Sequence, residues 1–591
     1  MDTTQPLYTV AQIRQIEADF EAEYPNAMPL MQRAGNVIGA HIESLLQRNF
    51  LREECLKTPE IRASSGIKAG VEIARSTAAD PKILVLVGSG NNGGDGILAA
   101  LALQQRDVHC VIAFTTPTRV VKHPLAKLAL DIFVSNGGVV ITVNAAQKAI
   151  TQNSYLIIVD AIFGIGMDIK QPVRPIDSGI YGLVEALNLR RQQLRLPVII
   201  ALDVPSGLNA ETGLPWLRNA DSTSDATPPI ALIADQTLTF ISNKVGLNTG
   251  DGADYAGDVF CFDLDIPQTL LPVAKHELLK HVDKPFAHRS NAKSNVHKGT
   301  FGTAVVLGGA LGMEGAGWLA ARAALLCGAG KTVFMQASLA PNSAASAVDF
   351  NYPEIIHTYV NNALETPYFR ASSAVAIGPG LGQSEAAAHI LEQVLQLETP
   401  VIVDADALTL VANSPALRAL CVARRSLTVF TPHPLEAAGL LHSCTPDVQA
   451  NRVAAAQQIA KTYNAITVLK GAGSITADVH GHVWINKSGN VGMASGGMGD
   501  VLSGMLSAAF CGVNAPKFSA GDITSHDHSA TNGATKIVAQ TVWLHGHAAD
   551  CCVAEGIGPV GLRATEVAEQ VRKIINKCQA KSTAQTSPPP L

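Results

Sequence analysis

The stretch that most constrains the fold is residues 490–504, with the sequence NVGMASGGMGDVLSG. Asp500 closes its glycine run, and an apolar helical pattern starts at Val501. Glycines let backbone N–H groups approach a ligand closely, and a helix N-terminus favours anionic groups, so the stretch predicts phosphate binding at a helix start. A carboxylate there could take the proton of a phosphoryl acceptor. The alternative is a glycine-rich turn with an aspartate cap, and the rest of the chain decides between the two. Four glycines fall within eight residues of this stretch: Gly492, Gly496, Gly497 and Gly499.

The composition indicates compact α/β domains. Hydrophobic residues make up 47% of the 591 residues, charged residues make up 16%, and the net charge is −5. A chain of this length exceeds what one hydrophobic core usually organises, so we expect at least two large domains. The small net charge argues against a nucleic-acid partner bound through a basic surface. No apolar run approaches the roughly 18 residues of a membrane helix, so we expect no membrane partner.

Cysteine and histidine usage predicts neither disulfides nor a zinc site. The ten cysteines are scattered without a CxxC pair, which signals neither a zinc ribbon nor a disulfide framework. The first residues have no basic and apolar regions of a secretory signal, so we expect reduced thiols and a cytoplasmic location. The histidine pairs at 526–528 and 545–547 could suggest a metal. The second pair lies in an apolar helical pattern where alternate positions face different sides, and we predict that neither pair binds one.

The first half of the chain has the pattern of a Rossmann-like sheet. An apolar strand at 82–87 leads into GSGNNGGDG at 88–96 and then into a helix, which is the phosphate-cradling unit of such folds. Two later strands, 156–159 and 197–202, are followed directly by Asp160 and Asp203. In open α/β sheets ligands bind at this carboxyl edge, so two acids beside a glycine loop favour a site over two turn-forming residues.

The second half repeats the alternation of strand and helix, which predicts a second α/β domain. Residues 272–294 lack an apolar period, so we place the domain boundary there and expect domains at 1–272 and 273–578. Residues 579–591 (QAKSTAQTSPPPL) are of low complexity and are predicted to be disordered. Residues 52–79 and 511–538 are interpreted as insertions, and residues 216–229 as a surface loop. The expected strands of this half are 303–307, 331–335, 374–377, 400–403, 427–430 and 466–469.

Together these motifs resemble the bifunctional NAD(P)H-hydrate repair enzymes over nearly the whole chain. In the first half the matching motifs are GSGNNGGDG at 88–96, DAIFGIGM at 160–167 and LDVPSGLNAETG at 202–213. In the second half they are HKGTFG at 297–302, GPGLG at 378–382, VDADAL at 403–408, TPHPLE at 431–436, KGAGS at 470–474 and GMASGGMGDVLSG at 492–504.

The resemblance implies an N-terminal Rossmann-like three-layer αβα domain that acts as an NAD(P)HX epimerase. It also implies a C-terminal ribokinase-like α/β domain that acts as an ADP-dependent (S)-NAD(P)H-hydrate dehydratase and releases AMP and phosphate. The implied substrates are NADHX, NADPHX and ADP. The implied cofactors are K⁺ in the epimerase domain and Mg²⁺ with ADP in the dehydratase domain, and we expect a homo-oligomer.

The resemblance also implies a role for individual residues. Asp203 and Asp500 resemble the catalytic acid–base groups, and Asn92, Asp160 and Ser206 resemble the potassium ligands. A basic residue that some family members carry lies about where Asp168 stands here. The residues that resemble substrate contacts are Asn91, Asn92, Gly93, Gly94, Asp95, Gly164, Ile165, Gly166, Met167, Asp168, Ile169, Lys170 and Asp203 in the first half, and Ala316, Gly382, His433 and Asp500 in the second. Those that resemble nucleotide contacts are Lys470, Gly471, Ala472, Gly473, Ser474 and Gly499.

Two alternatives stay open from the residues. A small-molecule kinase of the ribokinase-like class with a regulatory first domain would share the phosphoryl-transfer half of the chemistry. A binding or scaffolding role for the first domain is the second alternative, and the presence of Asp203 with Asn92, Asp160 and Ser206 argues against it.

Overall fold

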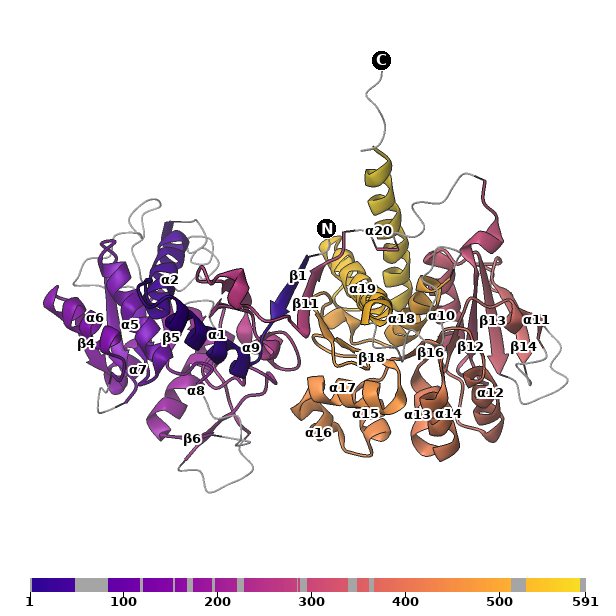
Figure 1. Cartoon of the computed structure of the whole chain (residues 1–591), viewed down its shortest axis with the longest axis horizontal. Coiled ribbons are helices and arrows are strands. Elements are labelled where there is room, and N and C mark those ends of the chain that lie inside the picture. The colour runs from indigo at the N-terminus through magenta and orange to yellow at the C-terminus, as the bar shows by residue number, and fades with distance from the viewer. Residues whose placement is uncertain are drawn as a thin grey trace, which may run out of the picture. The chain divides into compact units, whose positions relative to one another are not determined.

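The chain separates into two compact units in the computed structural model (Figure 1). The N-terminal unit is Pro6–Ala274, and the C-terminal unit is Lys275–Leu591 together with Met1–Gln5. The predicted boundary after residue 272 lies two residues before this division, but the first five residues belong to the other unit. The structure describes residues 3–47, 83–116, 121–151, 155–166, 174–193, 197–220, 228–283, 285–286, 295–337, 348–360, 366–511 and 528–584.

A seven-stranded sheet forms the centre of the N-terminal unit, and all its neighbouring strands are parallel. A separate two-stranded sheet pairs β6 (Arg174–Ile176) with β8 (Leu217–Asn219). The strand order of the main sheet is β10 (Asp258–Phe262), β9 (Gln236–Phe240), β7 (Val198–Leu202), β5 (Ile157–Ala161), β2 (Ile83–Val87), β3 (Cys110–Phe114) and β4 (Val139–Thr142).

Helices cover both faces of this sheet, as alternate side chains of its strands require. Along β2, Ile83, Val85 and Val87 pack into one core and Leu84 and Leu86 into another, because successive side chains of a strand point to opposite faces. This arrangement confirms the predicted three-layer Rossmann-like domain. The first core contains side chains of α1 (Val10–Glu23), α2 (Leu30–Gln47), α5 (Asn91–Gln104) and α6 (Pro124–Ser135), and the second those of α7 (Val143–Thr151) and α8 (Ser178–Gln193).

The C-terminal unit is built on an eleven-stranded sheet. Most neighbouring strands are parallel, but β19 is antiparallel to both of its neighbours. The strand order is β1 (Thr3–Leu7), β11 (His276–His281), β20 (Val483–Asn486), β19 (Ile475–Ala477), β18 (Ile466–Leu469), β17 (Thr428–Phe430), β16 (Val401–Val403), β15 (Ala374–Ile377), β12 (Thr303–Gly308), β13 (Lys331–Ala337) and β14 (Ile356–Val360).

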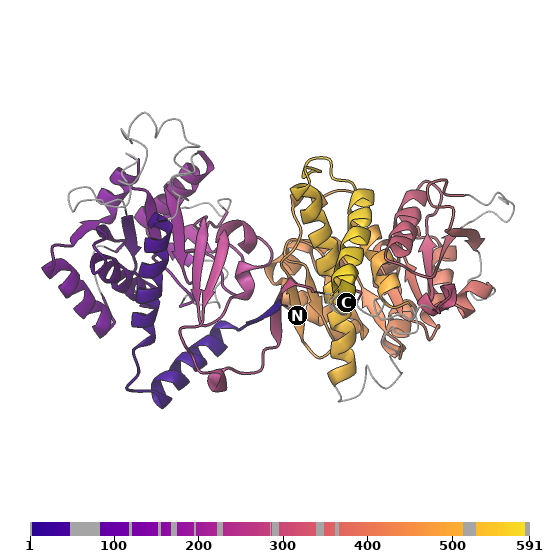
Figure 2. The same cartoon turned by 90° about the horizontal axis from the view of Figure 1, so that it is seen from above.

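Two helical layers cover this sheet, in agreement with the predicted α/β class. Figure 2 shows α19 and α20 side by side in yellow. Among the described residues, no helix is both long and apolar enough to cross a membrane. One layer contains α10 (Glu314–Leu326), α18 (Met498–Ala509), α19 (His528–Ala554) and α20 (Ala564–Ala584), and the other contains α12 (Glu385–Leu395), α13 (Ala405–Asn413), α14 (Pro415–Ala423), α15 (Pro434–Leu441), α16 (Thr445–Ala450) and α17 (Arg452–Tyr463).

Several expected loops contain regular structure. Strand β11 lies in the segment predicted as a linker, and β8 lies in the predicted surface loop at 216–229. Helix α19 begins within the predicted insertion at 511–538, and α20 continues to Ala584, past the predicted start of the disordered tail. The predicted insertion at 52–79 lies outside the described residues.

Candidate active sites

The N-terminal unit has a cavity of about 860 Å³ at the carboxyl edge of its sheet. Two of the predicted glycines, Gly93 and Gly94, are not among the residues that line this cavity. A Cβ on Gly93 would lie 2.0 Å from the Gly88 carbonyl oxygen, and one on Gly94 would lie 2.7 Å from the Met31 sulfur. Residues 167–170 of the predicted set lie outside the described part of the chain. The predicted residues that line the cavity are Asn91, Asn92, Asp95, Gly164, Ile165, Gly166 and Asp203.

The predicted glycine loop at 88–96 is mostly helix. Helix α5 begins at Asn91, and Gly90 is its N-cap without a side-chain hydrogen bond. The first N–H groups of a helix have no partner within the helix, and together with the helix dipole they attract anions. Asn91 therefore stands at an anion-attracting helix start that opens on the cavity.

Asp203 occupies a tight turn at the end of β7. Its φ is 65°, in the left-handed region, and the Val204 N–H donates to the Leu202 carbonyl at 2.8 Å across it. These features define a γ-turn with a positive φ at its centre, which is rare and strained for a non-glycine residue. Ile241 ends the neighbouring strand β9 in the same way, with a φ of 66°. Both residues line the cavity, and strain of this kind accumulates where function requires a fixed side chain.

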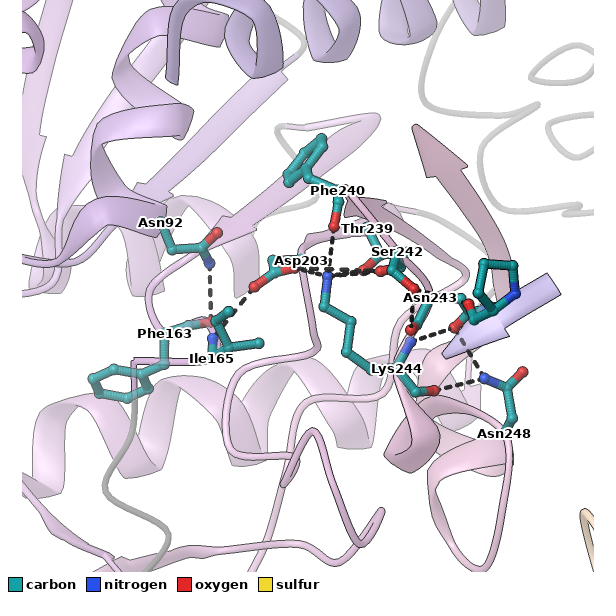
Figure 3. A network of polar contacts seen from close by, with 11 residues as sticks. Asn92, Phe163, Ile165, Asp203, Thr239, Phe240, Ser242, Asn243, Lys244 and Asn248 are labelled. Carbon is teal, nitrogen blue, oxygen red and sulfur yellow. Dashed lines mark hydrogen bonds and ion pairs between the residues drawn. The ribbon is translucent and has the colours of Figure 1, made fainter. Parts of the chain in front are cut away.

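A buried lysine, Lys244, holds the Asp203 carboxylate (Figure 3). Its Nζ lies 2.6 Å from Asp203 Oδ1 and donates to Thr239 Oγ1 at 2.7 Å. It also donates to the carbonyls of Phe240 and Ser242 at 2.9 and 3.0 Å. Sequence reasoning missed Lys244, because it follows the polar residues Ser242 and Asn243 and its segment gives no local sign that the lysine is buried.

The predicted potassium ligands are connected through the backbone of Phe163, whose N–H donates to Ser206 Oγ at 2.9 Å. Asp160 is fully buried, and it accepts hydrogen bonds from the Ser206 hydroxyl at 2.6 Å and the Ser206 N–H at 2.7 Å. Burial raises the pKa of Asp160 to about 6, although these hydrogen bonds favour the carboxylate. Asn92 Nδ2 donates to the Phe163 carbonyl at 2.9 Å, and its buried Oδ1 has no hydrogen-bond partner. A buried oxygen without a donor, a carboxylate and a hydroxyl are the kinds of ligand that a hard cation prefers.

In the C-terminal unit, Lys470 joins several acids at the carboxyl ends of β16, β17 and β18. Its Nζ lies 2.8 Å from Asp404 Oδ1 and 3.9 Å from Glu436 Oε2. Asp404 is buried, and its other oxygen accepts a hydrogen bond from Ser503 Oγ in α18 at 2.6 Å. Burial opposes the charge on Lys470, but the carboxylates of Asp404, Glu436 and Asp500 raise its pKa.

Asp500 lies in the first turn of α18, as predicted. The N-cap of this helix is Gly497, with a φ of 90°. A Cβ on Gly499 would lie 3.3 Å from Lys470 Nζ. The predicted residues Gly499 and Asp500, which are neighbours in the chain, therefore lie close to the predicted Lys470. Burial, and next the charge of Asp404, raises the pKa of Asp500 to about 6, although Lys470 opposes the shift. Such a group can act as a base near neutral pH.

His433 is the N-cap of α15 and is tied to Glu436. The ring Nδ1 of His433 accepts hydrogen bonds from the backbone N–H groups of Leu435 and Glu436. The backbone N–H of His433 donates to Glu436 Oε2 at 2.7 Å. Burial lowers the pKa of His433, and the charge of Lys470 lowers it further. Burial raises the pKa of Glu436 to about 7. The predicted His433 thus connects to the Lys470 group through Glu436, which the predicted set omitted.

Ala316 and Gly382 belong to a neighbouring group around residues 378–382. The Gly382 N–H donates to Asp406 Oδ2 at 2.9 Å, and a Cβ on Gly380 would lie 3.2 Å from the Ala316 Cβ. The structure therefore places Gly382 in the loop after β15 and Ala316 beside that loop.

Arg452 contacts the backbone of the predicted nucleotide loop 470–474. Sequence reasoning also missed this residue. Arg452 is buried at the start of α17, and its Nη2 donates to the Lys470 carbonyl at 3.2 Å. A Cβ on Gly471, whose φ is 139°, would lie 2.9 Å from that nitrogen. Ser474 Oγ donates to the Gly471 carbonyl at 2.9 Å and closes the loop. The only residue that allows this turn against the guanidinium is glycine.

One unit has the Asp203–Lys244 pair at a cavity that a helix start also lines, and the other has Asp500 at a helix start near Lys470. Two α/β units with such sites define a two-site enzyme. Residues 27–246 match the family model described as YjeF-related protein N-terminus, and residues 304–573 match that of NAD(P)H-hydrate dehydratase. The chain belongs to the family of bifunctional NAD(P)H-hydrate repair enzymes.

Relatives match over most of their length. The bifunctional NAD(P)H-hydrate repair enzyme Nnr of Escherichia coli is 32% identical, over 86% of this chain and 88% of the relative. The bifunctional NAD(P)H-hydrate repair enzyme of Leishmania braziliensis is 31% identical, over 89% of this chain and 91% of the relative. A solved structure of the ADP/ATP-dependent NAD(P)H-hydrate dehydratase of Bacillus subtilis is 28% identical, over 49% of this chain and 94% of that chain, with a TM-score of 0.39.

Proposed function

We propose that the chain repairs hydrated NAD(P)H with two activities. The N-terminal unit interconverts the R and S forms of NADHX and NADPHX. The C-terminal unit dehydrates the S form to NAD(P)H and converts ADP to AMP and phosphate. The observation that carries the proposal is that both units of a chain in this family keep a catalytic-type carboxylate beside a lysine, Asp203 with Lys244 and Asp500 with Lys470.

The dehydratase chemistry follows from the groups around Asp500. Hydroxide is a poor leaving group, and transfer of the terminal phosphoryl group of ADP to the hydroxyl makes it a good one. Asp500 takes the hydroxyl proton, and the N–H groups of the glycine-rich helix start stabilise the transferring group. Lys470 contributes positive charge towards the phosphates. The ring nitrogen then expels phosphate, and the adjacent carbon loses a proton to restore the dihydropyridine.

The epimerase chemistry requires loss of configuration at the carbon that carries the hydroxyl. This carbon is bonded to the ring nitrogen, so an iminium-like intermediate is accessible when the hydroxyl leaves. Asp203 is the group that moves a proton there, because its turn and Lys244 hold its carboxylate at the cavity wall. The helix start at Asn91 would attract a phosphate group of the nucleotide.

A monovalent cation and Mg²⁺ complete the proposal. The oxygen atoms of Asn92, Asp160 and Ser206 would hold K⁺, which would supply positive charge beside the nucleotide. The Asn92 oxygen without a donor supports this assignment. Mg²⁺ binds proteins through one or two carboxylates plus substrate phosphates, so it would arrive with ADP and neutralise charge on the diphosphate.

The test incubates the purified chain with mixed NADHX epimers, ADP and Mg²⁺, and follows the absorbance of the restored dihydropyridine. We expect both epimers to be consumed, because the epimerase replenishes the S form. ATP at matched Mg²⁺ tests the choice of nucleotide, since ATP turning over with much higher efficiency would overturn the assignment of ADP. A chain that phosphorylates a small molecule and forms no dihydropyridine would be the ribokinase-like kinase instead. Consumption of the S form alone would leave the N-terminal unit a binding module.

The cytoplasmic location and the homo-oligomeric state stay predictions. The nine free cysteines of the described residues accord with the reduced thiols expected there. Size-exclusion chromatography with light scattering would test the oligomeric state.

A further inference from the structure

Glu17 lines the same cavity as Asp203 but comes from a different element. It lies in α1, whereas Asp203 ends β7. Glu17 is half-buried, and within the described part of the chain it has no hydrogen-bond or ion-pair partner. The two carboxyl groups therefore differ in their surroundings, because Asp203 is fixed by the Lys244 ammonium and by the Ile165 N–H at 3.3 Å.

Burial and the nearby charge of Asp203 favour the protonated form of Glu17. Burial raises the pKa of Glu17 to about 7, and the negative charge of Asp203 is the next cause. Lys244 and Arg14 oppose the shift, and Glu21 adds to it. On α5, Asp95 also faces this group, and burial with the charges of Asp203 and Glu17 raises the pKa of Asp95. Lys122 and His123 are the remaining charged or titratable groups of the cavity wall.

Epimerisation at a hydroxyl-bearing carbon requires two proton movements. A proton must reach the departing hydroxyl so that water can leave, and a second must be removed from the water that returns on the other face. Two carboxyl groups of one cavity, one paired with an ammonium and one without a partner among the described residues, suit these two tasks. Asp203, beside an ammonium, suits the role of base, and a carboxyl group without such a partner suits the role of acid.

We propose that Glu17 is the second acid–base group of the epimerase, and this inference rests on the proposed function of the N-terminal unit. Glu17 gives its proton to the hydroxyl, the C–O bond breaks with its electron pair going to oxygen, and the ring nitrogen lone pair forms a C=N bond. A solvent water then adds to the carbon on the other face, and the C=N pair returns to nitrogen. Asp203 takes the proton of that water, and exchange with solvent resets both groups.

The test compares the full chain with Glu17→Gln in the conversion of the pure R epimer to a mixture, followed by chromatography of the epimers. We expect kcat to fall by about 10²-fold, the lower range for loss of a general acid. In the wild type, kcat should fall as the pH rises through about 7, because the acid must be protonated. That limb should be absent in Glu17→Gln and kept in Glu17→Asp. A role in positioning alone would leave the limb in place. Glu23→Gln, an exposed position at the end of α1, is the matched control and should match the wild type.

The outcomes separate this inference from the proposed function. If the wild type accelerates epimerisation and Glu17→Gln keeps its rate and pH profile, Glu17 has no acid–base role. If the wild type does not accelerate it over buffer, the epimerase function itself is overturned. Calorimetric unfolding of Glu17→Gln with an unchanged transition of the N-terminal unit shows that this unit is folded, and dehydration of the S epimer with ADP, which belongs to the other unit, should be unchanged.

Discussion

At the level of single residues, buried or half-buried carboxyl groups with raised pKa values occur at both candidate sites. Burial brings the pKa of Asp160 and Asp500 to about 6 and that of Glu436 to about 7. A carboxyl group in water titrates near 4, so these groups change charge close to the pH at which an enzyme works. Asp500 is the one of the three that stands at a helix start with a glycine cap.

Asp500→Asn should slow dehydration strongly with little change in the shape of the side chain. We expect kcat for NAD(P)H formation to fall by about 10²-fold or more, because the amide cannot take the hydroxyl proton. ADP binding, measured by calorimetry, should be largely kept. Asp447→Asn in α16 changes an exposed carboxylate outside the site and is the control. Near-normal turnover of Asp500→Asn would remove the residue from the mechanism.

The pH profile of the dehydratase should carry the signature of the same carboxyl group. A base acts only when it is deprotonated, and burial raises the pKa of Asp500 to about 6. Activity should therefore be full well above pH 6 and should fall about tenfold per pH unit below it. Initial rates at saturating ADP between pH 5 and 8 test this expectation. A rate that is flat down to pH 5 would contradict it.

Lys244→Met should disable the epimerase and weaken its domain. Removal of one partner of a buried ion pair leaves the other uncompensated, which costs about 3 kcal/mol or more. The variant also frees the Asp203 carboxylate from its fixed position. Calorimetric unfolding and R-to-S conversion measure the two effects. Lys127→Met on α6, at an exposed position, should shift stability by at most about 0.5 kcal/mol. Equal melting of the two variants would show that the ion pair contributes no stability.

At the level of whole elements, the close packing of α10 on α18 determines where Asp500 lies. Gly504 lies about one turn beyond Asp500 in α18. A Cβ on Gly504 would lie 2.0 Å from the Ala320 carbonyl oxygen in α10. Both helices contribute to one hydrophobic core over the sheet. The absence of a side chain at Gly504 therefore sets how close the two helices approach, and with it the position of the first turn of α18.

Gly504→Ala should force the two helices apart. We expect a loss of about 1–3 kcal/mol, the cost of overpacking a well-packed core. Gly533→Ala in α19 meets no atom within 4 Å and is exposed. It should instead stabilise the helix by up to about 1 kcal/mol, because alanine has the higher helix propensity. Calorimetry of both variants measures the difference in sign. A melting temperature of Gly504→Ala at or above the wild-type value would contradict the close contact.

The elements that the sequence predicts well are those buried on both faces. Strands β2 and β7 are unbroken apolar runs, and β5 is apolar except for Asp160, as parallel central strands require. Strand β11 has the sequence HELLKH and buries only Leu278 and Leu279, so its pattern does not differ from that of a linker. The start of α5 at Asn91 was also missed, because tertiary packing of glycines against Gly88 and Met31 overrides their low helix propensity.

The same distinction applies to the sites. Asp203 follows a strand and Asp500 closes a glycine motif, so local sequence was enough to select them as candidates. Lys244 and Asp404 act through partners that are distant in the chain; Lys470 and Asp404 are 66 positions apart. Only the fold brings such pairs together, and no local pattern encodes the pairing.

At the level of the whole molecule, the two activities belong to two separate units. Each unit has its own sheet, its own cores and its own candidate site. The first residues of the chain do not belong to the N-terminal unit. Met1–Gln5 belongs to the C-terminal unit, and β1 lies beside β11 at the edge of the eleven-stranded sheet. An edge strand shields the N–H and C=O groups of its neighbour.

The two units should therefore work as separate proteins, and the first residues should matter to the second. Residues 6–274 alone should epimerise R-NADHX as fast as the full chain within about twofold, because the cavity, Asp203 and Lys244 all lie within this range. Residues 275–591 alone should dehydrate the S form but melt at a lower temperature than the C-terminal transition of the full chain, because β11 loses its neighbour β1. Limited proteolysis of the full chain should give two stable fragments divided within residues 272–294. Cleavage mainly within residues 88–264, or fragments that neither fold nor act alone, would show that the units depend on each other.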